Sequence, residues 1–151
     1  MLMVRDADFH IVPGTPGDTD GVAEGSGFLR GAWAEAASPG AVRHVVALRG
    51  DGSAAAAFPL TARTIGPIRI NEIAGCYWPF RSVALAGSDD EIAALLSDAA
   101  MRRELGRAWR LGPVFDDDQA AVRLRKAVEA AGWTVLTRRL GTCFEIDVAG
   151  L

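Results

Sequence analysis

The chain has 151 residues, half of them hydrophobic, with a net charge of −3 at pH 7 and an isoelectric point near 5.3. This length predicts a single domain that buries roughly 70 % of the surface its unfolded chain exposes. The acidic balance argues against nucleic acid as a partner, because phosphate binding needs clustered cationic side chains. The two cysteines, Cys76 and Cys143, form no disulfide framework and have no metal-ligand spacing, so no metal site is expected.

The N-terminal quarter predicts a strand, a loop and a helix. Phe9–Val12 is a candidate strand, and the polar, glycine-rich stretch 15–25 is expected to be a loop without core residues. Ser26 can cap a helix from about Gly27 to Ala37, whose apolar side contains Leu29, Trp33, Ala36 and Ala37. The N-terminus lacks the apolar core of a signal peptide, and no run is long enough to cross a bilayer, so the chain is expected to be cytoplasmic.

Three consecutive strands are predicted next. Val45–Leu48 is a short apolar run with β-branched residues, and Gly50–Gly52 is typical of a hairpin turn. Ala54–Thr61 contains four alanines, which favour helix, but Pro59 leaves no room for one, so a strand with this proline at an edge or bulge is expected.

The third strand begins with the alternating residues Ile68 to Ile70. Its next large apolar residue is Ile73, which changes the phase of the alternation and predicts a β-bulge near residues 71–72. The segment Gly75–Arg81, which is rich in aromatic residues, follows this strand.

The second half alternates helices and strands. After a short extended piece at 82–86, Ser88 and Glu91 form a capping box that begins one long helix ending near Gly106. A strand at Trp109–Leu111 comes next. The acidic run 116–118 is read as the start of a second helix rather than as a metal site.

The last part of the chain predicts the end of that helix and two strands. Gly132 ends the helix, whose buried residues are Ala121, Leu124, Val128 and Ala131. Trp133–Thr137 and Cys143–Val148 are then expected to pair as two strands. The resulting order, β-α-β-β-β-α-β-α-β-β, predicts an α/β fold with a mixed, mostly antiparallel sheet flanked by helices.

This order resembles the acyl-CoA N-acyltransferase (GNAT) fold. Nearly the whole chain from Gly25 onward is similar to the first half of the FemAB-like, CelD-related tandem GNAT proteins of bacteria. The features that carry the resemblance are the aromatic helix Phe28–Ala36, the strand end Ala57–Leu60, the segment Tyr77–Arg81, and Gly112-Pro113-Val114 together with Ala130-Ala131-Gly132-Trp133.

The resemblance implies a domain arrangement and partners. Residues 1–151 would form one GNAT-like domain, with 1–25 partly loop and 26–151 as its core, and this domain would be the first half of a longer two-domain protein. In that family the second half usually holds the acyl-CoA, and a substrate channel lies between the halves. The expected partners are a CoA-binding GNAT half, in the same polypeptide or another chain, and a small-molecule or peptidyl amine.

The phosphate-binding loop of GNAT enzymes is missing where the resemblance requires it. That loop, Arg/Gln-x-x-Gly-x-Gly/Ala, follows the third strand of the meander and begins a helix, so that backbone N–H groups meet the pyrophosphate. Here the place is taken by Gly75–Arg81, where Trp78 and Phe80 are bulky and Pro79 has no N–H to donate. A match at Arg103–Ala108 lies between a helix and a strand, the reverse of the required context. We therefore expect this chain alone to bind no cofactor, and the complete protein to use acetyl-CoA or another acyl-CoA.

The residues predicted to contact substrate are Tyr77, Trp78 and Arg81. In one interpretation this segment is an aromatic plug that closes the sheet edge. In the other it lines the substrate channel, with the arginine meeting an anionic group and an aromatic ring stacking on the acceptor. The catalytic residue is not identified: His10 or His44 could act as a general base, but the sequence shows no partnered nucleophile for either.

Three functions remain open at this point. The first is the substrate-side half of an N-acyltransferase that acts on an amine and is inactive alone. The second is a non-catalytic GNAT-like binding module, which could form a homodimer through its alternating last strand. The third is a small free-standing N-acetyltransferase.

Overall fold

A five-stranded mixed sheet forms the centre of the molecule. The structure is a computed structural model, which describes residues 9–23, 29–74 and 82–141. The strands lie in the order of the sequence; from β1 to β4 each strand is antiparallel to its neighbour, and β5 runs parallel to β4. Their bounds are β1 (His10–Pro13), β2 (Arg43–Leu48), β3 (Ala54–Ile65), β4 (Ile68–Ile73) and β5 (Trp109–Arg110).

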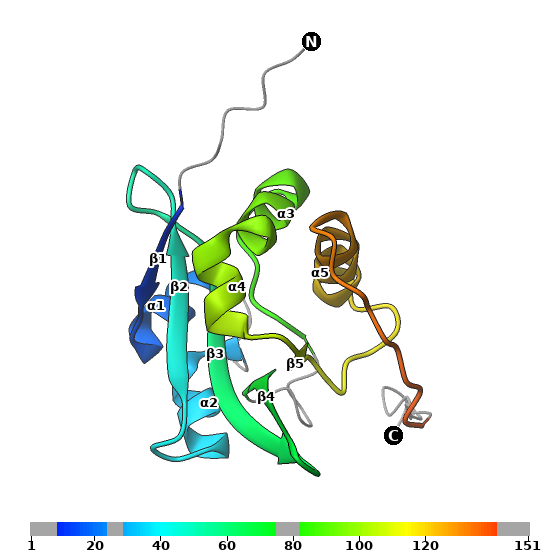
Figure 1. The fold of residues 1–151 in the computed structure, drawn as a ribbon. Helices are drawn as coiled ribbons and strands as arrows, with labels where there is room; N and C mark the ends of the chain where they lie inside the picture. The colour runs from blue at the N-terminus through cyan, green and yellow to red at the C-terminus, as the bar shows by residue number, and fades with distance from the viewer. Residues whose placement is uncertain (1–8, 24–28, 75–81, 142–151) are drawn as a thin grey trace, which may run out of the picture.

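Helices cover both faces of this sheet (Figure 1). The described helices are α1 (Pro16–Val22), α2 (Gly31–Ala37), α3 (Asp89–Ser97), α4 (Ala99–Leu105) and α5 (Gln119–Ala130). One hydrophobic cluster joins the sheet to α3, α4 and α5, and a second joins it to α1. The expected mixed α/β class with helices on both faces is therefore confirmed. No helix in the described part of the chain is long and apolar enough to span a membrane.

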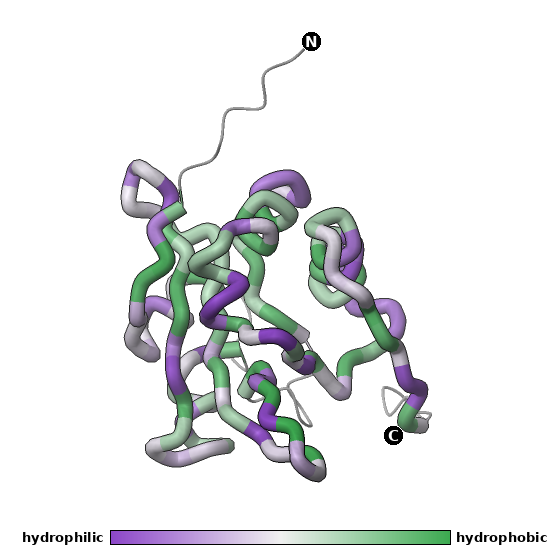
Figure 2. The backbone as a smooth tube through the Cα atoms, in the orientation of Figure 1, coloured by the Kyte–Doolittle hydropathy of each residue, from purple (hydrophilic) through white to green (hydrophobic). Residues whose placement is uncertain are grey.

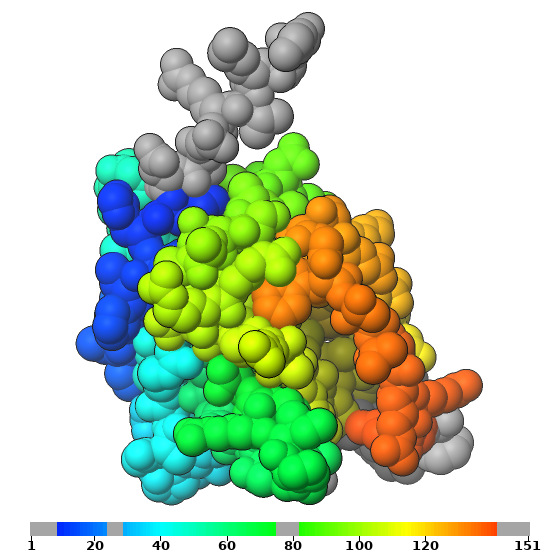
Figure 3. Space-filling view, in the orientation of Figure 1, coloured from blue at the N-terminus to red at the C-terminus, as the bar shows by residue number. Residues whose placement is uncertain are grey.

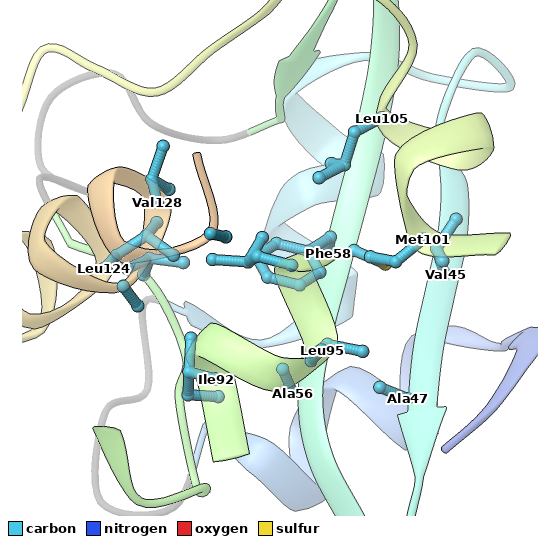
Figure 4. Packing of buried hydrophobic residues seen from close by; sticks show 14 of the residues in the cluster. Val45, Ala47, Ala56, Phe58, Ile92, Leu95, Met101, Leu105, Leu124 and Val128 are labelled. Carbon is cyan, nitrogen blue, oxygen red and sulfur yellow. The ribbon is translucent and has the colours of Figure 1, made fainter. Parts of the chain in front are cut away.

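Phe58 lies at the centre of the larger cluster. It is fully buried on β3 and is surrounded by side chains from α3, α4 and α5 (Figure 4). The labelled neighbours are Ile92, Leu95, Met101, Leu105, Leu124 and Val128. The apolar spacing predicted for α5 is confirmed, because Ala121, Leu124 and Val128 are buried.

The expected loop at 15–25 is wrong, because Pro16–Val22 is the helix α1. Thr15 begins it: its backbone N–H and its hydroxyl both donate to the Asp18 carboxylate, at 2.7 and 2.8 Å. Proline is favourable at the first helical position, where its missing N–H has no intrahelical acceptor to lose. The helix also has core content, since Thr19 and Val22 are buried.

The next helix is shorter than predicted and turned differently. α2 begins at Gly31 and buries Gly31 and Ala34, whereas Trp33, expected on the buried side, is 44 % exposed. The expected cap, Ser26, lies outside the described residues. The close approach of α1 explains the orientation, because a Cβ at Gly31 would lie 2.4 Å from the Cα and the carbonyl oxygen of Pro16.

The strand meander is confirmed, but its bulge lies elsewhere. β3 and β4 pair without interruption from Leu60–Ile73 to Ile65–Ile68, so the bulge predicted near residues 71–72 is wrong. The irregularity is instead between Ala47 and Leu48, in the β2–β3 ladder. Pro59 lies in β3, an interior strand, so its expected place at an edge or bulge is wrong. Its carbonyl oxygen accepts from the N–H of Ala74, one residue beyond the last pair of the β3–β4 ladder. The N–H that proline lacks would point to this same side, where no further β4 pair follows.

The single long helix expected after Ser88 is two helices. The capping box is confirmed, with the Glu91 N–H donating to the serine hydroxyl and the Glu91 carboxylate accepting from the serine N–H. Asp98 then adopts an extended conformation, and its carboxylate accepts from the N–H groups of the next helix. This side chain ends α3 and begins α4, and Gly106 ends α4 at a positive φ of 81° as predicted.

Residues 133–141 contain no strand, so the strand predicted at Trp133–Thr137 is wrong. The backbone and indole N–H groups of Trp133 donate to carbonyls of Val128 and Leu96, and Arg102 lies over its ring at 4.8 Å. These hydrogen bonds go to the helices. With β5, which is only two residues long, Trp133 makes a T-shaped ring contact through Trp109, with the ring centroids 6.2 Å apart. The expected partner strand, Cys143–Val148, lies outside the described residues.

Candidate functional site

A chain of three polar side chains connects the sheet with α1 and α2. His44, on β2, points to the face that these helices cover, and its Nδ1 lies 2.8 Å from the hydroxyl of Thr19 on α1. Its Nε2 lies 3.2 Å from Oε1 of Glu35 on α2. Thr19 is 1 % exposed and His44 is 5 % exposed, so these two groups meet almost out of contact with bulk water.

The contacts define the hydrogen-bonding roles when the imidazole is neutral. A carboxylate can only accept, so Nε2 carries the hydrogen and donates it to Glu35. Nδ1 then holds a lone pair, and the Thr19 hydroxyl donates to it. An imidazole positioned by a carboxylate and bonded to a hydroxyl is the arrangement in which histidine can take a proton from its neighbour.

The helices that carry Thr19 and Glu35 are held close together. The Asp20 carboxylate accepts from the Gly31 N–H at 2.7 Å, which fixes the start of α2 to α1. The backbone N–H of Thr15 and its hydroxyl both donate to the Asp18 carboxylate. These two hydrogen bonds, the backbone one first, hold the pKa of that carboxyl below its ordinary value. The polar chain is thus supported at both helix starts and at the strand.

A small cavity lies beside this polar chain. It has a volume of about 20 Å³, which is room for roughly one water molecule. Its wall includes Thr19, the exposed Arg30, and apolar residues of α2, β3 and β4. Ala74 and Ser82 also line it, and these are the described residues on either side of segment 75–81. The cavity can hold a water beside the threonine, but it is too small for an amine substrate of ordinary size.

The predicted substrate residues Tyr77, Trp78 and Arg81 lie outside the described residues. Their role therefore stays a prediction. The other candidate base, His10, lies on β1 with an exposed side chain. Of the two histidines, only His44 has side-chain hydrogen-bond partners in the described part of the chain.

The structure agrees with the predicted context of two further motifs. Arg103–Ala108 spans the last turn of α4 and the connection to β5, and there the carbonyl oxygens of Glu104 and Leu105 accept from the Asn71 amide at 3.0 Å. Carbonyls facing the neighbouring strand cannot act as an anion cradle, so this segment does not fit CoA phosphates. Asp118 caps α5 by accepting from the Ala121 N–H at 2.7 Å, which confirms the acidic run as a helix start. No three potential metal ligands converge within the described ranges.

Comparison with known protein families, with curated proteins and with solved structures finds no match to this chain. The fold and the polar chain therefore stand on the geometry alone.

Sequence reasoning identified one member of the polar chain and missed the other two. Thr19 lies in the stretch predicted to be a loop, although the capping signature Thr15-Pro16-Gly17-Asp18 and the spacing of Thr19 and Val22 indicate a short helix. Glu35 gave no signal, because an acidic residue on a predicted helix is normally solvent-exposed. Only the packing of α2 beside α1 brings its carboxylate to the imidazole.

Proposed function

We propose that this chain is the acceptor-side half of a GNAT-type N-acyltransferase, which transfers an acyl group from acyl-CoA to an amine. A CoA-binding half, in the same polypeptide or in another chain, would complete it. The observation that carries the proposal is the chain Thr19–His44–Glu35 beside a cavity that is lined in part by Ala74 and Ser82, the described residues that flank segment 75–81. That segment contains Tyr77, Trp78 and Arg81, the residues proposed to contact the acceptor.

The polar chain fits the chemical need of the acceptor. An amine is protonated near neutral pH and must lose a proton before or during attack on a thioester. The Thr19 hydroxyl borders the cavity, so a proton could pass to it from a water there, while its own proton moves to Nδ1 of His44. Glu35 holds the ring in the required tautomer and stabilises the imidazolium that forms.

The cofactor would come from the partner half. Acyl-CoA supplies the activated thioester carbonyl when it is bound. The described residues offer no row of free backbone N–H groups for its phosphates at Arg103–Ala108, where carbonyls face the neighbouring strand. The role left to this chain is to bind and orient the amine and to accept its proton.

A second candidate function is a non-catalytic GNAT-like binding module. The observation that favours it is the burial of the polar chain: Thr19 and His44 are nearly inaccessible, and the cavity holds about one water. In that case the three side chains only fasten α1 and α2 to the sheet. A homodimer through the predicted strand Cys143–Val148 would belong to this candidate.

Two measurements separate these functions from each other and from a free-standing acetyltransferase. Calorimetry of the chain with acetyl-CoA should show no micromolar binding; such binding would favour the free-standing enzyme. In the complete protein, or with its CoA-binding half present, Thr19→Val should slow acylation of the amine and Thr19→Ser should retain it. If Thr19→Val stays folded and turns over at the wild-type rate across the pH range, the proton relay is refuted and the binding module is favoured.

A further inference from the structure

The β3–β4 hairpin carries an exposed apolar stripe on one face. Ile65 and Ile68 pair directly at the end of the hairpin, and they are 50 % and 59 % exposed. Ile70, half-buried, lies two residues along β4 and therefore on the same face. Hydrophilic and hydrophobic residues alternate along the hairpin in Figure 2, as expected for a strand pair with two different faces.

Charged side chains border this stripe and are fixed in place. The Glu72 carboxylate accepts from Arg63 at 3.3 Å and lies 3.6 Å from a guanidinium nitrogen of Arg110 on β5. The register places all three on the face of the isoleucines, because Arg63 is two residues from Ile65 and Glu72 pairs with Arg110. We call this set the hairpin surface: Arg63, Ile65, Ile68, Ile70, Glu72 and Arg110.

This end of the molecule is strongly basic, although the chain as a whole is acidic. Arg69 lies on the other face of β4. Arg103 and Arg107 lie at the end of α4 and just after it, near the hydrogen bonds that Asn71 of β4 donates to carbonyl oxygens there. These three side chains have no ion pair within the described ranges. Together with the pair Arg43–Glu104 and the hairpin surface, and counted over both faces of the sheet, this end holds six arginines and two glutamates, a formal charge of +4. Of this charge the hairpin surface itself carries +1, from Arg63, Arg110 and Glu72. The total of −3 leaves −7 on the rest of the sequence.

The charge decides which partner fits. A second copy docked through the same surface would bring two surfaces of +1 into contact and two ends of +4 near each other, which like-charge repulsion opposes. A nucleic acid would need aromatic or cationic groups where the isoleucines lie. An apolar centre bordered by arginines is typical of a protein interface, since arginine is enriched there and its planar fork fits carboxylates.

We propose that the hairpin surface docks a protein partner whose own surface has an apolar centre surrounded by carboxylates. β3 connects this surface to the candidate site, because Ala57 and Pro59, which line the cavity, lie on the same strand face as Arg63 and Ile65. The hairpin forms one end of the molecule in Figures 1 and 3, where β1 and α1 do not reach it. A partner on this surface contacts the strand that also lines the cavity, whether or not that partner carries acyl-CoA.

Four defined probes test the chemistry of the partner with the whole chain. They are a random copolymer of glutamate and tyrosine, poly-L-glutamate, a duplex DNA oligonucleotide, and phosphatidylserine vesicles. At low salt the copolymer, which offers both carboxylates and apolar rings, should bind more tightly than each of the other three. Its affinity should fall as salt rises, because surface charges are screened.

Matched variants assign the binding to the hairpin surface. The double change Ile65→Ser with Ile68→Ser should weaken copolymer binding by roughly tenfold, to the level of poly-L-glutamate. Leu136→Ser removes a 92 % exposed apolar side chain elsewhere and should leave affinity unchanged. Arg63→Ala with Arg110→Ala should weaken both polypeptide probes, whereas changes of the exposed Arg125 and Lys126 on α5 to alanine should have a much smaller effect.

Several outcomes would overturn the proposal. One is that no probe binds at low salt. Another is that DNA or vesicles bind at least as tightly as the copolymer. A third is that the two serine changes leave copolymer binding intact in a protein whose melting temperature is that of the wild type. Equal weakening by Leu136→Ser would show that the contact is not specific to the hairpin.

Discussion

Replacing Thr19 by valine tests whether the polar chain is as closed as its geometry indicates. Valine has nearly the same shape, so the change removes one hydroxyl with little loss of packing. The lost hydrogen bond is the 2.8 Å contact to Nδ1 of His44, and both groups are at most 5 % exposed. An imidazole nitrogen left buried without a donor costs about 1–3 kcal/mol. Each kcal/mol lowers the melting temperature by roughly 2–4 °C in a domain of this size.

Urea unfolding followed by tryptophan fluorescence measures this loss. The matched control is Thr61→Val, because Thr61 is also buried and makes no side-chain hydrogen bond among the described residues. That control should change stability by no more than about 0.5 kcal/mol. If Thr19→Val lowers the free energy of unfolding no more than Thr61→Val does, a water in the adjoining cavity hydrogen-bonds to the imidazole. The inference that the polar chain is closed to water is then refuted.

Three further predictions concern helix starts and the proposed site. Two hydrogen bonds to the Glu91 carboxylate, first from the Arg49 side chain and then from the backbone N–H of Ser88, lower the pKa of Glu91 to about 2. Because this pKa is below the unfolded value of about 4.3, the Arg49–Glu91 pair contributes its full stabilisation above that pH and loses it as the pH falls toward 2. Glu91→Gln should lower the free energy of unfolding by about 1 kcal/mol at pH 7 and make it less dependent on pH in this acid range. Gly31→Ala should destabilise by about 1–3 kcal/mol in thermal unfolding because its Cβ meets backbone of α1, whereas Gly21→Ala, which meets nothing within 4 Å, should be neutral or stabilising. In the complete protein, Arg81→Ala should slow amine acylation and leave the melting temperature nearly unchanged; a large drop in melting temperature would assign the residue to structure.

Local signals in the sequence were sufficient for the meander and for two helix starts. Each of these signals acts over a few residues, so it forms in the same way whatever lies around it. They are the apolar run Val45–Leu48, the glycine turn Gly50–Gly52 and the capping box Ser88–Glu91. The errors came where two local signals competed. Asp98 could continue a helix or cap a new one, and its carboxylate took the cap. Trp133 has strand propensity, but its backbone and indole N–H groups donate to carbonyls of α5 and α3 and not to a strand.

The candidate site was accessible to the sequence only in part. His44 was recognisable as a histidine beginning a core strand, yet nothing near it in sequence could serve as its partner. Its partners lie 25 and 9 residues away, on helices whose relative position depends on a glycine contact and on one side-chain hydrogen bond. Periodicity cannot specify such distances, because it reports which side of an element is apolar and not which element packs beside it.

The sequence by itself determined that this is a mixed α/β chain with an antiparallel meander, because alternation, turn residues and caps are local properties of the backbone. Only the tertiary structure decided that a threonine, a histidine and a glutamate share hydrogen bonds beneath two helices. It alone also decided that the end of one hairpin is left apolar and basic. Both results depend on how separate elements pack, since burial and charge clustering are properties of surfaces that distant segments form together.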